Sequence, residues 1–173
     1  MQARQAVLLS RKILESVTPL HFDCGTLCRA QCCQPLEGDE ISGMLLFPGE
    51  ENFYSTSADW YRLVPSHLPG ITLFVCTGTC PREERPLACR IFPLLPIIRK
   101  DGSSGFRMDM RGHGLCPLCS QGRSALSPDF IHAVSECSGI LAQSEEIRAF
   151  ILTIQKEEKA IRDLLKSLNR PVS

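Results

Sequence analysis

Four cysteines lie close together in the segment Phe22-Asp-Cys24-Gly-Thr-Leu-Cys28-Arg-Ala-Gln-Cys32-Cys33. Three of them, Cys24, Cys28 and Cys32, recur every four residues. Positions four apart on a helix differ by only about 40° around its axis, so the three thiols would point the same way. Clustered thiolates are ligands for zinc and for iron–sulfur clusters. The spacing therefore predicts a metal site at this block.

The N-terminal sequence predicts a reducing environment for these thiols. Its apolar run, Ala6-Val-Leu-Leu9, is four residues long and has charges on both sides, which is far short of a signal-peptide core or a membrane span. We therefore expect a cytoplasmic protein with no membrane partner. In the cytoplasm clustered cysteines stay reduced, so metal binding or redox chemistry is favoured over structural disulfides.

The composition is that of an ordinary globular protein. The chain has 173 residues, of which 43% are hydrophobic and 22% charged. A chain of this size buries roughly 70% of its unfolded surface, so it does not need its ten cysteines merely to fold. Lysine plus arginine equals aspartate plus glutamate at 19 each, so no net positive field gathers phosphates. We expect no nucleic-acid partner.

Helices are predicted at both ends of the chain. Residues 2–17 carry apolar side chains at helical spacing, and Pro19 ends the pattern. Ser127-Pro128-Asp129 is a helix start with serine as the cap, and Gly139 is expected to end or bend that helix. A further helix is expected after Ser144. Its apolar stripe, which would pack on the domain or permit self-association, is Ile147, Ile151, Ile154, Ile161, Leu165 and Leu168.

Short apolar runs between turn-forming residues predict a small antiparallel sheet. The expected strands cover residues 44–47, 60–64, 71–76, 94–100 and 106–110. The last two flank Asp101-Gly-Ser-Ser-Gly105, which is typical of a hairpin, and Pro96 favours an edge strand.

The predicted fold class is α+β, with a small antiparallel sheet and cysteine-bearing loops flanked by N-terminal and C-terminal helices. We expect a metal-binding cysteine-cluster domain over residues 1–125, including the N-terminal helix. A helical region over residues 126–173 is expected to pack on that domain.

Two further blocks supply the other candidate ligands. The second is Cys76-Thr-Gly-Thr-Cys80-Pro-Arg-Glu-Glu-Arg85-Pro86-Leu-Ala-Cys89-Arg90-Ile-Phe92-Pro93, and the third is His113-Gly-Leu-Cys116-Pro-Leu-Cys119. The three blocks hold enough cysteines for two four-thiolate sites or one polynuclear cluster. The expected metal ligands are Cys24, Cys28, Cys32, Cys33, Cys76, Cys80, Cys89 and Cys116.

Charge and geometry add expectations for the neighbouring residues. Four thiolates around Zn²⁺ leave a formal charge of about −2, which is costly to bury without donors nearby. Arg85 and Arg90 are expected to donate to sulfur, the alternative being ordinary pairing with carboxylates. Adjacent thiols point apart, so one of Cys32 and Cys33 can bind a metal while the other serves a second metal or packs as a small apolar residue. Outside the ligand set, Cys119 is a reserve ligand, Cys137 a buried thiol and His113 a solvated loop residue.

The blocks resemble the zinc- or iron-chelating cysteine-cluster family, often called YkgJ-like or CxxCxxCC proteins. The resemblance covers roughly residues 22–120 and is carried by Cys24, Cys28, Cys32-Cys33, Gly78-Thr-Cys80, Arg85-Pro86, Cys89-Arg90, Phe92-Pro93 and Cys116. The first block departs from the family name, with three residues rather than two between Cys24 and Cys28. The resemblance implies chelation of zinc or iron, including an iron–sulfur cluster, in a family whose members mostly lack an assigned reaction.

Three functions compete on this sequence. The first is a metal-binding module whose partner is the metal ion, with a protein partner and the oligomeric state left open. The second is implied by a related group that looks like flagellin lysine N-methylases, which use S-adenosylmethionine. It would be a metal-cluster-dependent enzyme, but no glycine-rich cofactor loop is identified. The third is a thiol redox switch at Cys116-Pro-Leu-Cys119, which lacks the strand and helix setting of a thioredoxin-like site.

Overall fold

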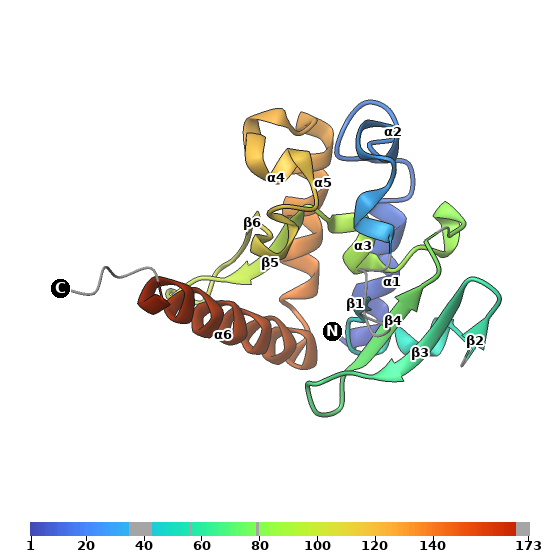
Figure 1. The fold of residues 1–173 in the computed structure, drawn as a ribbon. Helices are drawn as coiled ribbons and strands as arrows, with labels where there is room; N and C mark the ends of the chain where they lie inside the picture. The colour runs from blue at the N-terminus through green and yellow to red at the C-terminus, as the bar shows by residue number, and fades with distance from the viewer. Residues whose placement is uncertain (35–42, 56, 79, 169–173) are drawn as a thin grey trace.

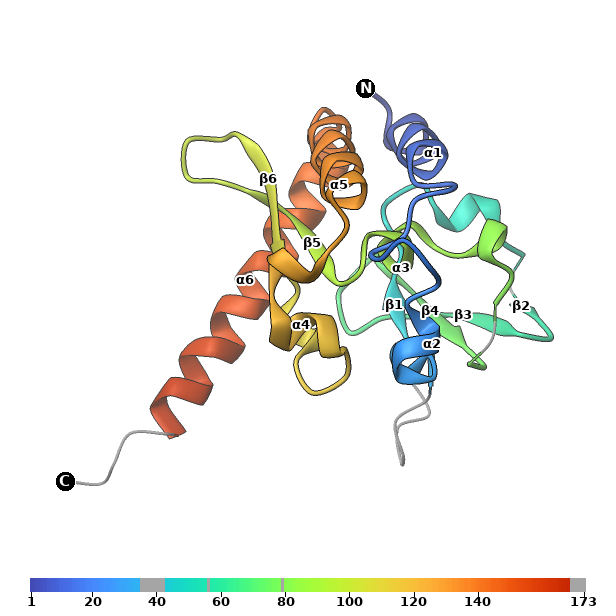
Figure 2. The same cartoon turned by 90° about the horizontal axis from the view of Figure 1, so that it is seen from above.

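The N-terminal helix, α1 (Ala3–Ile13), confirms the helix expected over residues 2–17 and ends earlier than expected. The computed structural model describes residues 1–34, 43–55, 57–78 and 80–168. Helix α1 buries one face against α5 (Pro128–Leu141), and the two helices run side by side in Figure 2. Between them, the Cys137 thiol donates to the Ser10 carbonyl oxygen at 3.5 Å. Cys137 is thus the buried thiol that the sequence predicted.

A four-stranded antiparallel sheet occupies one side of the molecule (Figure 1). Its strand order is β1-β4-β3-β2, and the strands are β1 (Met44–Leu45), β2 (Ser57–Ala58), β3 (Tyr61–Pro65) and β4 (Thr72–Cys76). Phe74 of β4 stacks on Tyr61 of β3 with ring centroids 4.8 Å apart, and Trp60 and Tyr54 complete this aromatic cluster. The cluster fixes β4, which ends at Cys76.

The predicted hairpin forms a separate two-stranded sheet from β5 (Leu94–Ile98) and β6 (Ser104–Met108). Pro96 is tolerated because β5 has a partner on one side only. On the other side, Gln155 of α6 (Glu145–Leu168) uses its side-chain amide to bond both the N–H and the C=O of Ile98, at 2.8 and 3.1 Å. In Figure 2 the hairpin and α6 lie on the left, the four-stranded sheet on the right, and α5 between them.

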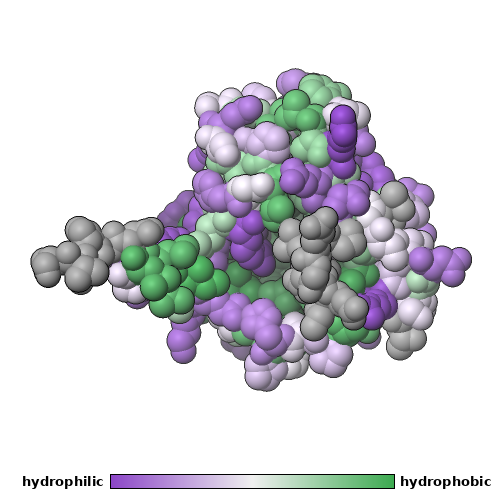
Figure 3. Space-filling model, viewed as in Figure 1, coloured by the Kyte–Doolittle hydropathy of each residue, from purple (hydrophilic) through white to green (hydrophobic). Residues whose placement is uncertain are grey.

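The C-terminal helices differ from expectation in two ways. Helix α5 continues through Gly139 to Leu141, because a helix interior tolerates glycine at a modest cost. Ser127 does occupy the N-cap position, although its side chain makes no cap hydrogen bond. The apolar stripe of α6 packs only in its first half, which includes Ile147, Phe150, Ile151 and Ile154. After Glu158, the last buried residue of α6, the helix projects from the body and leaves Ile161, Leu164, Leu165 and Leu168 exposed, as the green end of the helix in Figure 3 shows.

The fold class is α+β, as predicted. Three short helices, α2 (Gly25–Cys28), α3 (Leu87–Ile91) and α4 (Pro117–Gln121), belong to the cysteine blocks. The 3₁₀-helices are Gln31–Cys33, Glu51–Phe53, Arg82–Glu84, Met110–Gly112 and Arg123–Ala125. None of the described helices is long and apolar enough to cross a membrane.

One hydrophobic core joins residues on both sides of the expected domain boundary at 125/126. Helix α5 contacts α1 and both strands of the hairpin, and α6 contacts β5. The division of the chain into residues 1–125 and 126–173 stays a prediction. Residues 35–42, 56, 79 and 169–173 of these two ranges lie outside the described residues.

Gly112 occupies a position with no room for a side chain. A Cβ atom there would lie 2.4 Å from Cys119 Sγ and 2.9 Å from the Phe92 ring. We expect Gly112→Ala to lower the free energy of unfolding by about 1–3 kcal/mol. Gly139→Ala is the matched control: its Cβ would meet only Ser104 Oγ at 4.0 Å, so alanine should add about 0.5–1 kcal/mol within α5. Chemical denaturation measures both; equal small effects would contradict close packing at Gly112.

Candidate metal centre

The first cysteine block is not one helix, which corrects the expectation that Cys24, Cys28 and Cys32 share a helical face. Helix α2 stops at Cys28 because Arg29 and Ala30 both adopt left-handed backbone conformations, with φ of 53°. A non-glycine residue in this conformation costs about 1–2 kcal/mol, and two in succession end any helix. Cys32 and Cys33 therefore lie on a separate 3₁₀ turn, Gln31–Cys33.

The second block links the sheet to the short helix α3. Cys76 ends β4, and its sulfur accepts a hydrogen bond from the Gly78 N–H at 3.4 Å. Gly78 has a φ of 106°, which favours glycine. After Cys80 the chain forms the 3₁₀ turn Arg82–Glu84 and then α3, which carries Cys89 and Arg90.

The third block presents Cys116 at the N-cap of α4. Cys119, one turn later, is buried and hydrogen-bonds to the Cys116 side chain. Its sulfur also lies 3.7 Å from the Asp109 carbonyl oxygen. Cys119 is therefore buried next to Cys116, and this burial raises the pKa of the Cys119 thiol to about 12. His113 is exposed, in agreement with its expected place in a solvated loop.

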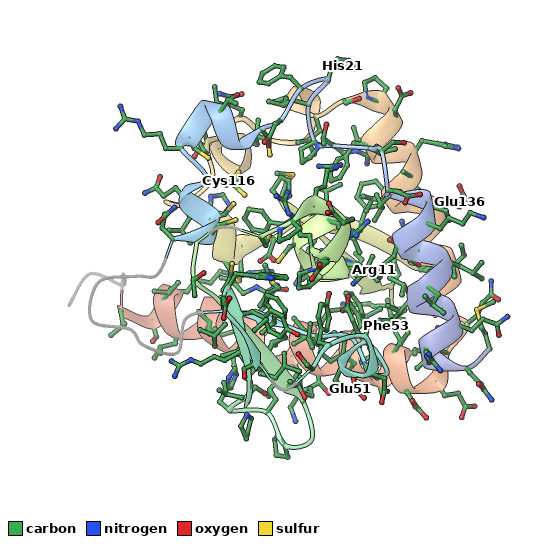
Figure 4. All side chains as sticks on the ribbon, turned by 90° about the vertical axis from the view of Figure 1, so that its right-hand side faces the viewer. Arg11, His21, Glu51, Phe53, Cys116 and Glu136 are labelled. Atoms are coloured by element: carbon green, nitrogen blue, oxygen red, sulfur yellow. The ribbon has the colours of Figure 1, made fainter. Side chains whose placement is uncertain are left out.

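The three blocks meet although they are far apart in sequence. Figure 4 shows sulfur atoms in yellow gathered near the labelled Cys116, where α2 and the turn after it approach the α4 segment. All eight predicted ligands line at least one of three adjoining cavities, which share several lining residues. Cys119 and Cys137 line none of these three.

The smallest of these, here called the apolar cavity, has a volume of about 20 Å³. Its sulfur lining is Cys24, Cys28, Cys32 and Cys116, and its other walls include Leu27, Phe92, Pro93 and Leu118. A volume of this size holds little more than one water-sized atom. The cavity therefore offers space for a single ion rather than an organic ligand.

The other two cavities lie on either side of Arg85, which lines both. The strand-end cavity, about 70 Å³, has the sulfur lining Cys32, Cys33, Cys76, Cys80 and Cys89. The arginine cavity, about 60 Å³, is lined by Cys24, Cys32, Cys33 and Cys89 together with Arg82, Arg85 and Arg90. Thiols and guanidinium groups thus face the same small spaces.

The sulfurs are close without forming a finished coordination sphere. Within the described part of the chain, no group of three or more His, Cys, Asp or Glu side chains is already arranged to hold a metal ion. Cys32 Sγ and Cys33 Sγ lie 3.9 Å apart, which corrects the expectation that these adjacent thiols point apart. Ligation would require the thiol side chains to be rearranged. Metal binding would then be coupled to local folding.

The two arginines of the second block behave differently from one another. Arg85 hydrogen-bonds to Cys80, which agrees with its expected role as a donor to sulfur. Arg90 instead donates to backbone carbonyls, to Glu83 O at 2.6 Å and to Arg85 O at 2.9 Å, so it fixes the loop that presents Cys80 and Cys89. Among the described residues neither has an ion-pair partner within 4.0 Å, so ordinary carboxylate pairing is not what holds them.

Hydrogen bonds between thiols favour the thiolate at two positions. Cys76 donates to Cys80, and this bond, with further help from Arg85, lowers the pKa of Cys80 to about 6. Cys32 likewise hydrogen-bonds to Cys33 and lowers the pKa of Cys33 to about 7. Burial raises the pKa of Cys89 above its usual range. In each pair the pKa of one thiol is thus lowered towards the thiolate, the form that binds a metal, and the pKa of its partner, Cys76 or Cys32, is raised.

Glu50 supports the candidate site and was not identified from the sequence, because nothing in the sequence distinguishes it from its neighbour Glu51, which is half-buried. Its carboxylate is fully buried and accepts from the Leu87 N–H at 2.7 Å, from the Phe47 N–H at 3.2 Å and from Arg11 at 3.1 Å. Leu87 begins α3, so Glu50 ties the Cys89-bearing helix to α1. Burial raises the pKa of Glu50, and these three donors oppose that shift.

No protein-family model, curated protein or solved structure matches this chain. The resemblance of its cysteine blocks to the YkgJ-like family therefore stays a prediction from the sequence motifs.

Proposed function

We propose that this protein binds zinc or iron, the latter as single ions or in an iron–sulfur cluster, through thiolates of its three cysteine blocks. One observation carries the proposal: eight cysteines from three separate segments line adjoining small cavities. A folded chain has no packing reason to bring eight thiols together, because a free cysteine with a structural role is simply buried, as Cys137 is.

The donor chemistry supports zinc or iron over harder metals. Sulfur ligands select zinc, iron–sulfur clusters and copper(I), whereas magnesium and calcium require oxygen ligands. Among the described residues that line the sulfur-lined cavities, Asp23 is the one acidic side chain, and it lines the arginine cavity. The resemblance to the YkgJ-like family points to the same two metals.

The charges around the cavities also support the proposal. Four thiolates around a divalent ion carry about −2, and burying that charge requires compensating donors. Arg82, Arg85 and Arg90 line the arginine cavity, and in the described residues none of them pairs with a carboxylate within 4.0 Å. Their guanidinium groups are positioned to offset the negative charge of metal-bound thiolates.

Metal analysis of the protein purified without oxygen tests the proposal. We expect at least one equivalent of zinc or iron per chain, with inorganic sulfide present only if an iron–sulfur cluster is bound. The double variant Cys32→Ser/Cys33→Ser should lose most of this metal, because Cys32 lines all three cavities and Cys33 lines two of them.

Cys137→Ala serves as the matched control, since its thiol lies in the interface between α1 and α5, and it should keep its full metal content. Wild-type protein that binds neither metal, as purified or after reconstitution with zinc or with iron and sulfide, would exclude the proposed function. Methyl transfer with S-adenosylmethionine remains the alternative, and it requires a methyl acceptor that metal analysis does not reveal.

A further inference from the structure

We propose that the eight cysteines form two separate four-thiolate sites, and that the neighbours Cys32 and Cys33 belong to different ones. The first thiol set is Cys24, Cys28, Cys32 and Cys116, and the second thiol set is Cys33, Cys76, Cys80 and Cys89. Each set would hold one zinc ion or one iron–sulfur cluster. This inference rests on the proposed function, because it divides the same ligands.

Two of the three cavities divide the sulfurs in this way, whereas the arginine cavity adjoins both and is lined by two members of each set. The apolar cavity is lined by all four members of the first set and by no member of the second. The strand-end cavity is lined by all four members of the second set, and Cys32 is the one member of the first set that reaches it. The apolar cavity is therefore surrounded by the four thiols that a tetrahedral metal ion takes, and the strand-end cavity by the four of the second set together with Cys32.

The interactions between thiols follow the same division. In the first set, Cys24 is close enough to Cys28 and Cys116 for their charges to interact, and Cys32 interacts with Cys24 and Cys28. In the second set, Cys89 interacts with Cys33 and Cys80, and Cys76 interacts with the same two residues. The sets meet at the 3.9 Å contact between Cys32 Sγ and Cys33 Sγ. Apart from their contact with each other, Cys32 interacts with thiols of the first set and Cys33 with thiols of the second set.

Arg85 and Phe92 occupy the boundary between the two sets. Arg85 lines the arginine and strand-end cavities, and its charge acts on Cys24 of the first set as well as on Cys33 and Cys80 of the second. Phe92 lines the arginine and apolar cavities. A guanidinium between two centres of about −2 each reduces their repulsion. One polynuclear cluster would instead have to displace both side chains.

Paired substitutions within each set test the division, with bound zinc, iron and sulfide per chain as the measurement. We expect Cys24→Ser/Cys28→Ser to lose half of the wild-type metal and Cys76→Ser/Cys80→Ser to lose the other half. The quadruple variant should lose all of it. Cys137→Ala is again the control that keeps the full amount.

Single substitutions of the adjacent pair decide which sulfur goes where. In a competition with a chelator, Cys32→Ser should release the same half of the metal as the first pair of substitutions, and Cys33→Ser the other half. Combined substitutions check this assignment. Cys32→Ser added to Cys24→Ser/Cys28→Ser should remove no further metal, whereas Cys33→Ser added to the same double variant should remove the remaining metal. Circular dichroism confirms that each variant is folded.

A single shared cluster predicts a different result, in which either pair of substitutions releases all the metal. That result would overturn the two-site inference while leaving metal binding intact. So would the finding that Cys32→Ser and Cys33→Ser release the same half of the bound metal. A wild-type protein without metal would instead contradict the proposed function itself.

Discussion

Removal of the proposed metal should lower the thermal unfolding midpoint of the purified protein by about 10–20 °C. Structural zinc contributes about 10–16 kcal/mol in small zinc-finger peptides, whereas this chain has a hydrophobic core of its own. We therefore expect a smaller loss, of about 5 kcal/mol, and each kcal/mol shifts the midpoint by about 2–4 °C in a chain of this size. Differential scanning calorimetry before and after chelation measures the shift.

The same loss should be local. In hydrogen exchange, amides of residues 24–34 and 76–89 should lose protection after chelation, because their thiol-bearing turns bury few apolar side chains. Amides in the middle of α1 and α5 should keep theirs, because those helices pack in the main core. Re-addition of zinc, or of iron with sulfide, should restore both the thermal unfolding midpoint and the hydrogen-exchange protection. An unchanged melting curve in fully metal-free protein would show that the metal has no structural role.

Glu50→Ala should lower the free energy of unfolding by about 3–5 kcal/mol, the range for removal of one member of a buried ion pair. The substitution leaves three donors without their acceptor: Arg11 and the backbone N–H groups of Phe47 and Leu87. Because Leu87 starts α3, the helix that carries Cys89 should also be loosened. Urea denaturation measures the loss of stability.

Glu84→Ala is the matched control for this prediction, since Glu84 is exposed and its side chain has no recorded ion pair in the described residues. It should change stability by less than about 0.5 kcal/mol. Glu50→Gln should lie between the two, because an amide keeps one acceptor oxygen and loses the charge. A Glu50→Ala protein as stable as Glu84→Ala would show that α3 is held in place without this carboxylate.

The elements with strong local signals were predictable from the sequence. The hairpin of β5 and β6 follows from its turn residues and apolar runs, and α1, α5 and α6 follow from helical spacing. The pairing of β1 with β4 was not predictable, because β2 and β3 lie between them in sequence and long-range pairing leaves no local pattern.

The eight cysteines that line the adjoining cavities are the ones that the sequence grouped together, but their local geometry was not predictable. The spacing of Cys24, Cys28 and Cys32 has the period of a helix, yet Arg29 and Ala30 break that helix by adopting a conformation that sequence rules assign mainly to glycine. Cys24, Cys28 and Cys32 therefore do not share one helical face, because Cys32 lies on the separate turn Gln31–Cys33. Glu50 was missed because two of its three donors, Arg11 and the Leu87 N–H, are distant in sequence, and no short segment reveals them.

The side-chain amide of Gln155 has a consequence for how this protein behaves in a crowded solution. Strand β5 contains the apolar run Leu94-Leu-Pro-Ile-Ile98, and an exposed strand edge of that kind recruits strands from other molecules and starts aggregation. By bonding both backbone groups of Ile98, Gln155 imitates a neighbouring strand at that end of the edge. Pro96, which has no N–H, blocks the middle of the edge in a different way.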